Sequence, residues 1–388
     1  NTPLPTVRPD LLTLPGLLRK NGYTTISLGK VFHHGKADAP DAWSVDPWMP
    51  PAGQWVNPSN MRGTNDLTEE AAGSRPRAFE RYDAEDGAYR DGQVASKALS
   101  YLSSLSKSGQ PFFLAAGFIK PHLPFVCPEK YWRLYDNETI NLPAYQAKPE
   151  GGPDIAMTNW GELRRYKGIP AVGPLPADTS RLLIQGYMAC VSFTDAQVGK
   201  LLDEVERLGL KDNTVIVLFG DHGWHLGDHG LWCKHTNFEQ ATRAPLIIYV
   251  PGIKGGKSES AMVEFVDVYP SIAEVCGLSP EKQTEGRSLV QLMKNPGMNW
   301  NEVAFSQYPR GRIMGYSART QRFRYTAWID KQGRITQSEF YDYLTDPLET
   351  KNNVRNPEYQ PEVENLKSLV TSYASGRYIK DKGATGPQ

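Results

Sequence analysis

Four short and mostly apolar runs occur along the first 250 residues, and each is flanked by turn residues or polar clusters. They cover residues 24–28, 111–118, 214–219 and 245–250. Short runs of this kind, with few polar positions, are typical of strands that are buried on both faces of a largely parallel sheet. The pattern therefore predicts the strands of a central sheet.

Segments with the apolar spacing of an α-helix lie between and around these runs. They cover residues 11–21, 91–105, 187–208 and 263–275, and in each the apolar positions form one stripe. Helices that alternate with buried strands predict an α/β fold, in which a mostly parallel central sheet is sandwiched by helices. Residues 38–90 and 148–178 show weak periodicity and many Pro, Gly and charged residues, so we expect surface insertions there.

The pattern changes after about residue 295. Short alternating runs predict antiparallel strands, followed by a final helix at residues 361–373; the expected strands are residues 302–307, 311–319, 322–329 and 338–343. We therefore expect two domains: a catalytic α/β domain at residues 1–295, and a smaller C-terminal α+β subdomain, built on an antiparallel sheet, at residues 296–388.

Charge and cysteine content exclude several classes of protein. Lys and Arg together number 43, and so do Asp and Glu, so the chain lacks the basic excess of a nucleic-acid binder. No stretch of about 18 apolar residues predicts a membrane span. The four cysteines lie far apart without metal-ligand spacing, which favours buried thiols over a disulfide framework; they are Cys127, Cys190, Cys233 and Cys276.

Candidate chemistry gathers directly after the predicted strands. Lys30 follows the first run, His122 the second, and the pair Asp221 and His222 the third. Ligand sites of open α/β sheets lie beyond the carboxyl ends of the strands, so we expect these side chains at one edge of the sheet. An adjacent carboxylate and imidazole suit a divalent cation. A proline-stiffened cationic loop suits an anion or the protonation of a leaving group.

Taken together, these segments resemble the type I sulfatases of the alkaline-phosphatase superfamily. The matching motifs are the Gly-Lys at residues 29–30, Lys-Pro-His-Leu-Pro-Phe at 120–125, Gly-Asp-His-Gly at 220–223 and Lys234. Residues 339–342 and 345–349 resemble the signature of the family's C-terminal subdomain. Residues 30–33, 305–317 and 322–328 are similar to the iduronate-2-sulfatase type within that family.

The resemblance implies a role for each candidate residue. Asp221 and His222 would be ligands of one Ca²⁺ ion, whose other ligands would be carboxylates upstream of Asn1. Three residues would act on the sulfate ester, with His122 protonating the leaving group and the two lysines contacting sulfate; they are Lys30, His122 and Lys234. Three further residues would recognise the sugar: His33, Trp224 and Arg312.

One family feature has no counterpart in this sequence. The family's nucleophile is a formylglycine made from the Cys of a Cys-x-Pro-Ser-Arg segment, and neither this segment nor the family's Asp-Asp pair occurs between Asn1 and Gln388. We expect both upstream of Asn1, on a companion N-terminal polypeptide, a removed part or a stretch outside the present sequence.

The sequence thus predicts a sulfatase that acts on sulfated saccharides, with the 2-O-sulfate of a uronic acid as the expected substrate. Because sulfated glycans are mostly extracytoplasmic, the expected location is periplasmic, secreted or lysosomal. Two alternatives stay open: a phosphatase or phosphonate hydrolase of the same superfamily, and an inactive sugar-binding pseudo-sulfatase.

Overall fold

The computed structural model describes residues 2–33, 35–61, 75–300 and 303–378. The chain forms two compact units, which are treated separately below. Unit 1 consists of residues 1–142 and 162–214, and unit 2 of residues 143–161 and 215–388. None of the helices in the described part of the chain combines the length and the apolar character that a bilayer crossing requires.

Unit 1 is built around two parallel strands, β1 (Thr24–Gly29) and β3 (Phe112–Gly117), which pair from Thr24 with Phe112 to Gly29 with Gly117. Helix α2 (Leu14–Lys20) leads into β1, and the hydroxyl of Thr13 accepts the backbone N–H of Gly16 at its start. Helix α4 (Arg90–Leu105) packs its apolar stripe against the strands. The resulting core contains Ile26, Leu28, Val94, Ala98 and Leu105.

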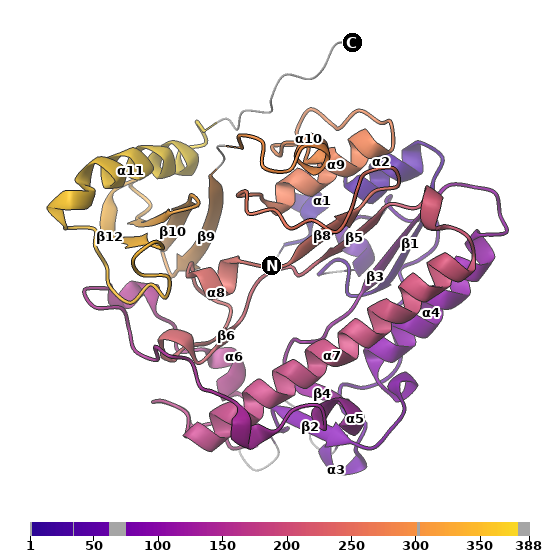
Figure 1. Cartoon of the computed structure of the whole chain (residues 1–388), viewed down its shortest axis with the longest axis horizontal. Coiled ribbons are helices and arrows are strands. Elements are labelled where there is room, and N and C mark those ends of the chain that lie inside the picture. The colour runs from indigo at the N-terminus through magenta and orange to yellow at the C-terminus, as the bar shows by residue number, and fades with distance from the viewer. Residues whose placement is uncertain (1, 34, 62–74, 301–302, 379–388) are drawn as a thin grey trace. The chain divides into compact units, whose positions relative to one another are not determined.

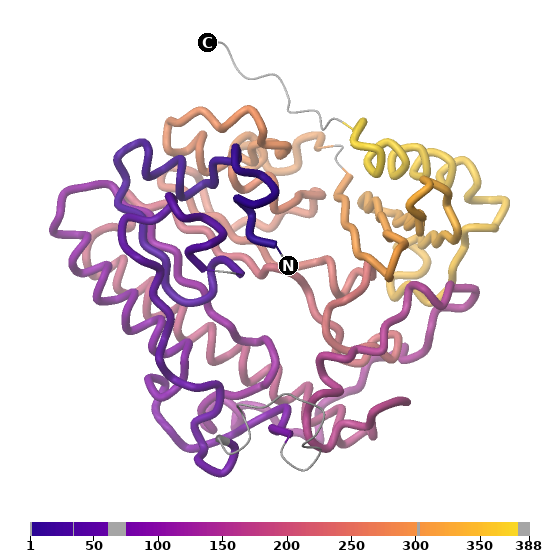
Figure 2. The backbone as a smooth tube through the Cα atoms, turned by 180° about the vertical axis from the view of Figure 1, so that it is seen from behind, coloured from indigo at the N-terminus to yellow at the C-terminus, as the bar shows by residue number. Residues whose placement is uncertain are grey.

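A second layer of unit 1 forms around the 31-residue helix α7 (Ala177–Arg207). This helix runs beside α4 in Figures 1 and 2. It also packs on β4 (Phe125–Pro128), which pairs in parallel with β2 (Phe79–Tyr82). Gly186 permits the close approach, because a Cβ there would lie 3.0 Å from the Cβ of Phe125 on β4 and 2.6 Å from the Trp132 ring. The remaining short helices are α1 (Leu4–Val7), α3 (Pro58–Met61), α5 (Glu129–Trp132) and α6 (Gly161–Arg164).

The part of unit 2 that follows residue 214 begins with two small antiparallel pairs. Strand β5 (Ile216–Phe219) pairs with β8 (Leu246–Tyr249), and β6 (His225–Leu226) pairs with β7 (Trp232–Cys233). Helix α9 follows a single 3-10 turn. The helices of this part are α8 (Glu239–Thr242), α9 (Val268–Val275) and α10 (Val290–Lys294).

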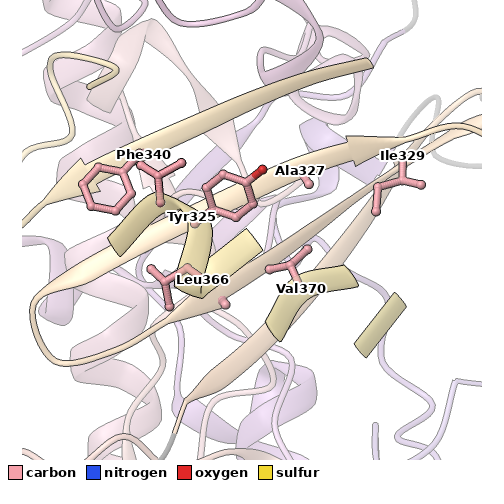
Figure 3. Packing of buried hydrophobic residues seen from close by; sticks show 8 residues of the cluster. Tyr325, Ala327, Ile329, Phe340, Leu366 and Val370 are labelled. Carbon is pink, nitrogen blue, oxygen red and sulfur yellow. The ribbon is translucent and has the colours of Figure 1, made fainter. Parts of the chain in front are cut away.

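The C-terminal part of unit 2 is a four-stranded antiparallel sheet covered by helix α11 (Gln360–Ala374). Neighbouring strands in the sheet are also neighbours in sequence; they are β9 (Ala304–Arg310), β10 (Ile313–Arg319), β11 (Phe323–Ile329) and β12 (Ile335–Asp342). Figure 3 shows how Leu366 and Val370 of α11 meet Tyr325 and Phe340 of the sheet. All four side chains are at most 1% exposed, so this sheet and helix share one dry core.

The α/β fold class is confirmed, with parallel pairs in unit 1 and an antiparallel sheet near the C-terminus. Several details differ from expectation; α9, for example, starts at Val268 and not at residue 263. The pair of β5 and β8 is antiparallel, α7 starts ten residues before the expected 187, and β2 lies in a region expected to be irregular. Residue 302, the expected start of the first C-terminal strand, lies outside the described residues. The division into domains at residue 295 stays a prediction, and the compact units are bounded elsewhere.

Candidate functional site

The ends of β1 and β3 form the base of the predicted site in unit 1. A Cβ on Gly29 would lie 2.2 Å from the Gly117 carbonyl oxygen, and a Cβ on Gly117 would lie 2.1 Å from that of Lys30. Such distances exclude any side chain, so the two backbones touch where the strands end. The backbone N–H of Lys30 donates to the Gly117 carbonyl at 2.9 Å. The segments that bear Lys30 and His122 therefore leave the sheet at the same edge.

The loop that bears His122 is fixed from within the protein. The Asp91 carboxylate, 1% exposed, accepts the backbone N–H groups of Ile119 and Lys120 at 2.9 and 2.8 Å. Burial raises the pKa of Asp91. The Lys120 ammonium donates to the carbonyls of His122 and Pro124 at 3.1 and 2.6 Å, and burial lowers its pKa. The Lys120 side chain thus stabilises the loop by donating hydrogen bonds to two of the loop's backbone carbonyls.

Both ring nitrogens of His122 meet oxygen atoms. Nδ1 lies 2.8 Å from the carbonyl oxygen of Leu123, and Nε2 lies 2.7 Å from Oε1 of Glu162 on α6. The side chains of His122 and Glu162 are 29% and 22% exposed. Sequence patterns gave no reason to single out Glu162, which lies 40 residues further along the chain.

In unit 2, Asp221 and His222 follow β5 directly. Asp221 Oδ1 and His222 Nε2 are 3.5 Å apart, and the Asp221 side chain is 69% exposed. His222 Nδ1 lies 2.7 Å from the Gly223 carbonyl oxygen. Because a carbonyl only accepts, Nδ1 carries a proton, and in the neutral ring the lone pair is on Nε2, on the side of Asp221.

The side chains of Asp221 and His222 fit a divalent cation. Oδ1 of Asp221 and Nε2 of His222 are 3.5 Å apart, so both atoms can lie about 2.3–2.6 Å from one Ca²⁺ ion. A metal-binding histidine usually donates its other ring N–H to a carbonyl or carboxylate, as Nδ1 does here. Gly223 is required here, since a Cβ would lie 2.0 Å from the Gln240 carbonyl oxygen. Across the described ranges, no group of three or more His, Cys, Asp or Glu side chains forms a metal cluster. The assignment to metal therefore stays a prediction.

Trp224 and Lys234 lie beside this pair. The Trp224 ring stacks on His222 with a centroid distance of 6.0 Å, and Lys234 Nζ is 5.1 Å from the Trp224 ring centroid. The buried Cys233 has a φ of 68°, in the left-handed region that side chains rarely adopt. This conformation turns the chain just before Lys234.

The C-terminal sheet holds the Lys234 loop in place. The Arg310 guanidinium donates to the His235 carbonyl, and the Asn237 side-chain amide donates to the Gly315 carbonyl at 3.2 Å. The buried Arg324 donates to the Asn237 carbonyl at 2.8 Å. Arg324 also pairs with Glu349 at 2.9 Å and with Glu239. These anchors come from β9, β10 and β11, so the sheet is part of the framework of the site.

The predicted sugar contacts differ in their placement. Trp224 lies within the cluster of unit 2, whereas Arg312 is exposed in the two-residue turn between β9 and β10. His33 is exposed in unit 1. Arg310, which sequence patterns did not single out, contacts the Tyr308 ring at 4.7 Å as well as the Lys234 loop.

The predicted residues thus fall into two groups. Lys30, His33 and His122 belong to unit 1, and the other five belong to unit 2: Asp221, His222, Trp224, Lys234 and Arg312. Within unit 2, contacts join His222 to Trp224 and Trp224 to Lys234.

Comparison with known proteins is consistent with this geometry. Residues 2–278 match the family model of sulfatases, and residues 227–375 match the C-terminal model of N-sulphoglucosamine sulphohydrolase. Iduronate 2-sulfatase of Homo sapiens is 32% identical over 88% of this chain and 76% of its own length.

Solved structures show the same fold at lower identity. A protein in complex with its substrate D-glucosamine-2-N,6-O-disulfate is 22% identical, with a TM-score of 0.71 over 95% of this chain and 82% of its own. A phosphonate monoester hydrolase of Agrobacterium radiobacter is 18% identical, with a TM-score of 0.72 over 94% and 80%. At these identities the likeness shows the fold alone.

Proposed function

Since the chain belongs to the sulfatase family and is a sulfuric ester hydrolase, we propose that it removes the 2-O-sulfate of a uronic acid in a sulfated glycan. The 32% identity to iduronate 2-sulfatase over 88% of the chain is the observation that supports this substrate. Because such glycans are mostly extracytoplasmic, we propose a periplasmic, secreted or lysosomal location.

Asp221 and His222 would hold one Ca²⁺ ion, together with carboxylates from outside residues 1–388. When bound, the ion would supply positive charge to a sulfate oxygen and to the nucleophile. The nucleophile would be a formylglycine on a segment outside residues 1–388.

The residues of this chain would neutralise charge and donate a proton. Lys30 and Lys234 would bind the non-bridging sulfate oxygens, since an ammonium is a compact charge that suits a tetrahedral anion. His122 would protonate the sugar oxygen as the S–O bond breaks. Cations that face the developing negative charge stabilise the transition state.

His33 and Arg312 would recognise the uronate carboxylate, and Trp224 would line the pocket. Arg312 is exposed in a turn, where a guanidinium can reach a carboxylate and bind it through two hydrogen bonds. Arg312→Ala should raise KM for a uronate sulfate and leave a simple aryl sulfate unchanged. Arg334→Ala, at another exposed turn of the same sheet, is the matched control. Equal loss on both substrates would refute the role of Arg312.

The test of the function compares three substrates on the protein purified with any companion chain. We expect turnover of a 2-O-sulfated iduronate disaccharide and of p-nitrophenyl sulfate, a much slower reaction with p-nitrophenyl phosphate, and loss of all turnover with EDTA that Ca²⁺ restores. Faster phosphate hydrolysis would favour the phosphatase alternative. Binding of the sulfated disaccharide with no turnover of any of the three substrates would favour a sugar-binding pseudo-sulfatase.

A further inference from the structure

Two segments of unit 1 bring basic side chains together on the protein surface. Residues 75–81 are Arg-Pro-Arg-Ala-Phe-Glu-Arg, and residues 164–167 are Arg-Arg-Tyr-Lys. Arg77 and Lys167 form a parallel β-bridge, and the backbone N–H of Lys167 donates to the Pro76 carbonyl at 2.9 Å. Residues that pair in this way project their side chains to the same face. Since Arg77 and Lys167 are both exposed, two cations lie next to each other there.

Two further arginines extend this pair. Arg75 and Arg165 lie two residues before Arg77 and Lys167 on the two segments; Arg165 is exposed, and Arg75 is partly exposed. We call these four residues the cationic patch. Across the described ranges, the side chains of the cationic patch form no hydrogen bond or ion pair. No carboxylate in that part of the chain therefore neutralises their charge.

The two acidic residues that lie three positions from the cationic patch pair with other groups. Glu80 is 2% exposed, and its Oε1 accepts the backbone N–H groups of Val56 and Asn57 at 2.8 and 3.2 Å. Oε1 of Glu162 lies 2.7 Å from Nε2 of His122. Like charges that face each other across paired strands are destabilising, so an anion from outside the chain would relieve an unfavourable interaction.

The two segments are held in place by buried contacts. The Arg164 side chain is buried, and its guanidinium donates to the carbonyls of Pro170 and Gly173. Ala78, on the other segment, is 1% exposed. The backbone that carries the cationic patch is thereby fixed before a ligand arrives, so binding an anion there orders only side chains.

The cationic patch lies close to the predicted site of unit 1. Glu162, which contacts His122, is five residues before Lys167. Five residues of chain span at most about 18 Å, whereas charges are screened over about 10 Å at 0.1 M salt. The cationic patch therefore acts little on a single group bound at His122, but a chain of sugars that extends from His122 can reach it.

We propose that the cationic patch binds further sulfate or carboxylate groups of the glycan whose 2-O-sulfate lies at His122. This inference rests on the proposed function, and it makes the protein selective for oligosaccharides over a disaccharide. The support is charge complementarity. The chain as a whole is neutral, with 43 basic and 43 acidic residues, so unpaired cations that gather in one place suit a polyanionic ligand.

The test compares a 2-O-sulfated disaccharide with a hexasaccharide of the same repeating unit. In the parent protein, kcat/KM should be higher for the hexasaccharide, and this advantage should shrink when the salt concentration is raised. In the double variant Arg77→Gln/Lys167→Gln, kcat/KM for the hexasaccharide should fall roughly 2- to 30-fold through KM, the range for two exposed ion pairs. The disaccharide and p-nitrophenyl sulfate should change less than about twofold, since neither reaches the cationic patch.

Two comparisons complete the design. Lys20→Gln/Lys107→Gln removes the same charge from unit 1, at exposed positions that precede β1 and β3 and so lie at the opposite end of these strands from Lys30 and His122. This control should keep the parent's advantage for the hexasaccharide. Calorimetry with a hexasaccharide that carries 6-O-sulfate but no 2-O-sulfate gives a readout without turnover, and its Kd should rise in the Arg77 and Lys167 double variant alone.

The outcomes separate this inference from the proposed function. If the parent hydrolyses no sulfate ester but binds the 6-O-sulfated hexasaccharide more tightly than the double variant does, the proposed function fails and the cationic patch is still supported. Equal kcat/KM for the two saccharides in the parent overturns the inference and leaves the proposed function intact. An equal loss in the double variant and the control also overturns it. Tighter binding of a single-stranded oligonucleotide of the same charge would overturn the assignment to a glycan.

Discussion

Arg324→Met should destabilise the protein far more than the loss of one ordinary charge. The Arg324 side chain is 2% exposed and lies 2.9 Å from a carboxylate oxygen of Glu349, which is fully buried. It also pairs with Glu239. Burial alone would raise the pKa of Glu239, but the guanidinium groups of Arg324 and Arg319 lower it. Removing one partner of a buried pair costs about 3–5 kcal/mol, because the other charge stays buried.

Urea unfolding followed by tryptophan fluorescence measures this loss. Domains are typically stable by about 5–15 kcal/mol, and with a slope of about 3 kcal/mol/M the midpoint should fall by about 1 M or more. Arg334→Met is the matched control, since Arg334 is 75% exposed and pairs with Asp330 in the turn after β11. It should cost less than about 1 kcal/mol. Equal midpoint shifts in the two variants would refute the reasoning.

Three further changes test other parts of the structure. Burial raises the pKa of Glu339 to about 7 from 4.5. The contribution of this group to the free energy of unfolding is therefore complete below pH 4.5 and is lost as the pH rises through 7. Between pH 5 and pH 9, the free energy of unfolding of Glu339→Gln should therefore rise relative to that of the parent by on the order of 2–3 kcal/mol, as measured by urea unfolding. A difference between variant and parent that does not depend on pH would contradict this. Gly223→Ala forces a Cβ to 2.0 Å from the Gln240 carbonyl and should abolish thermal stabilisation by Ca²⁺, whereas Gly199→Ala, with open space around its Cβ, should leave it intact. Lys120→Met removes both bonds of its ammonium to the loop and should lower kcat for the sugar sulfate at least tenfold; unchanged kinetics would show that the loop holds without it.

The sequence predicted those elements whose apolar pattern is clear within one segment. Residues 24–28 and 91–105 match β1 and α4 within one residue at each end. By contrast, β2 mixes Phe and Tyr with Glu and Arg in four residues. Its sequence therefore lacks the alternating pattern that would have predicted a strand. The direction of the β5 and β8 pair depends on tertiary packing, which apolar runs do not encode.

The candidate site was predictable where chemistry follows a strand end. Asp221, His222 and His122 each follow such an end, and their residue types already indicate metal binding or proton transfer. The residues that support them could not be found in this way. Asp91 and Glu162 lie about 30 and 40 residues from the loop they contact, and nothing in their local sequence distinguishes them from surface carboxylates.

The anchoring of residues 234–237 by the C-terminal sheet limits how this protein can be recombined with its relatives. Arg310, Gly315 and Arg324 lie on three consecutive strands, and each bonds to that loop. A chimera joined near residue 296 would exchange all three anchors at once while keeping the loop they hold. Functional exchange of the C-terminal part should therefore require residues 234–237 to be transferred with it, although they are some 60 residues upstream of the junction.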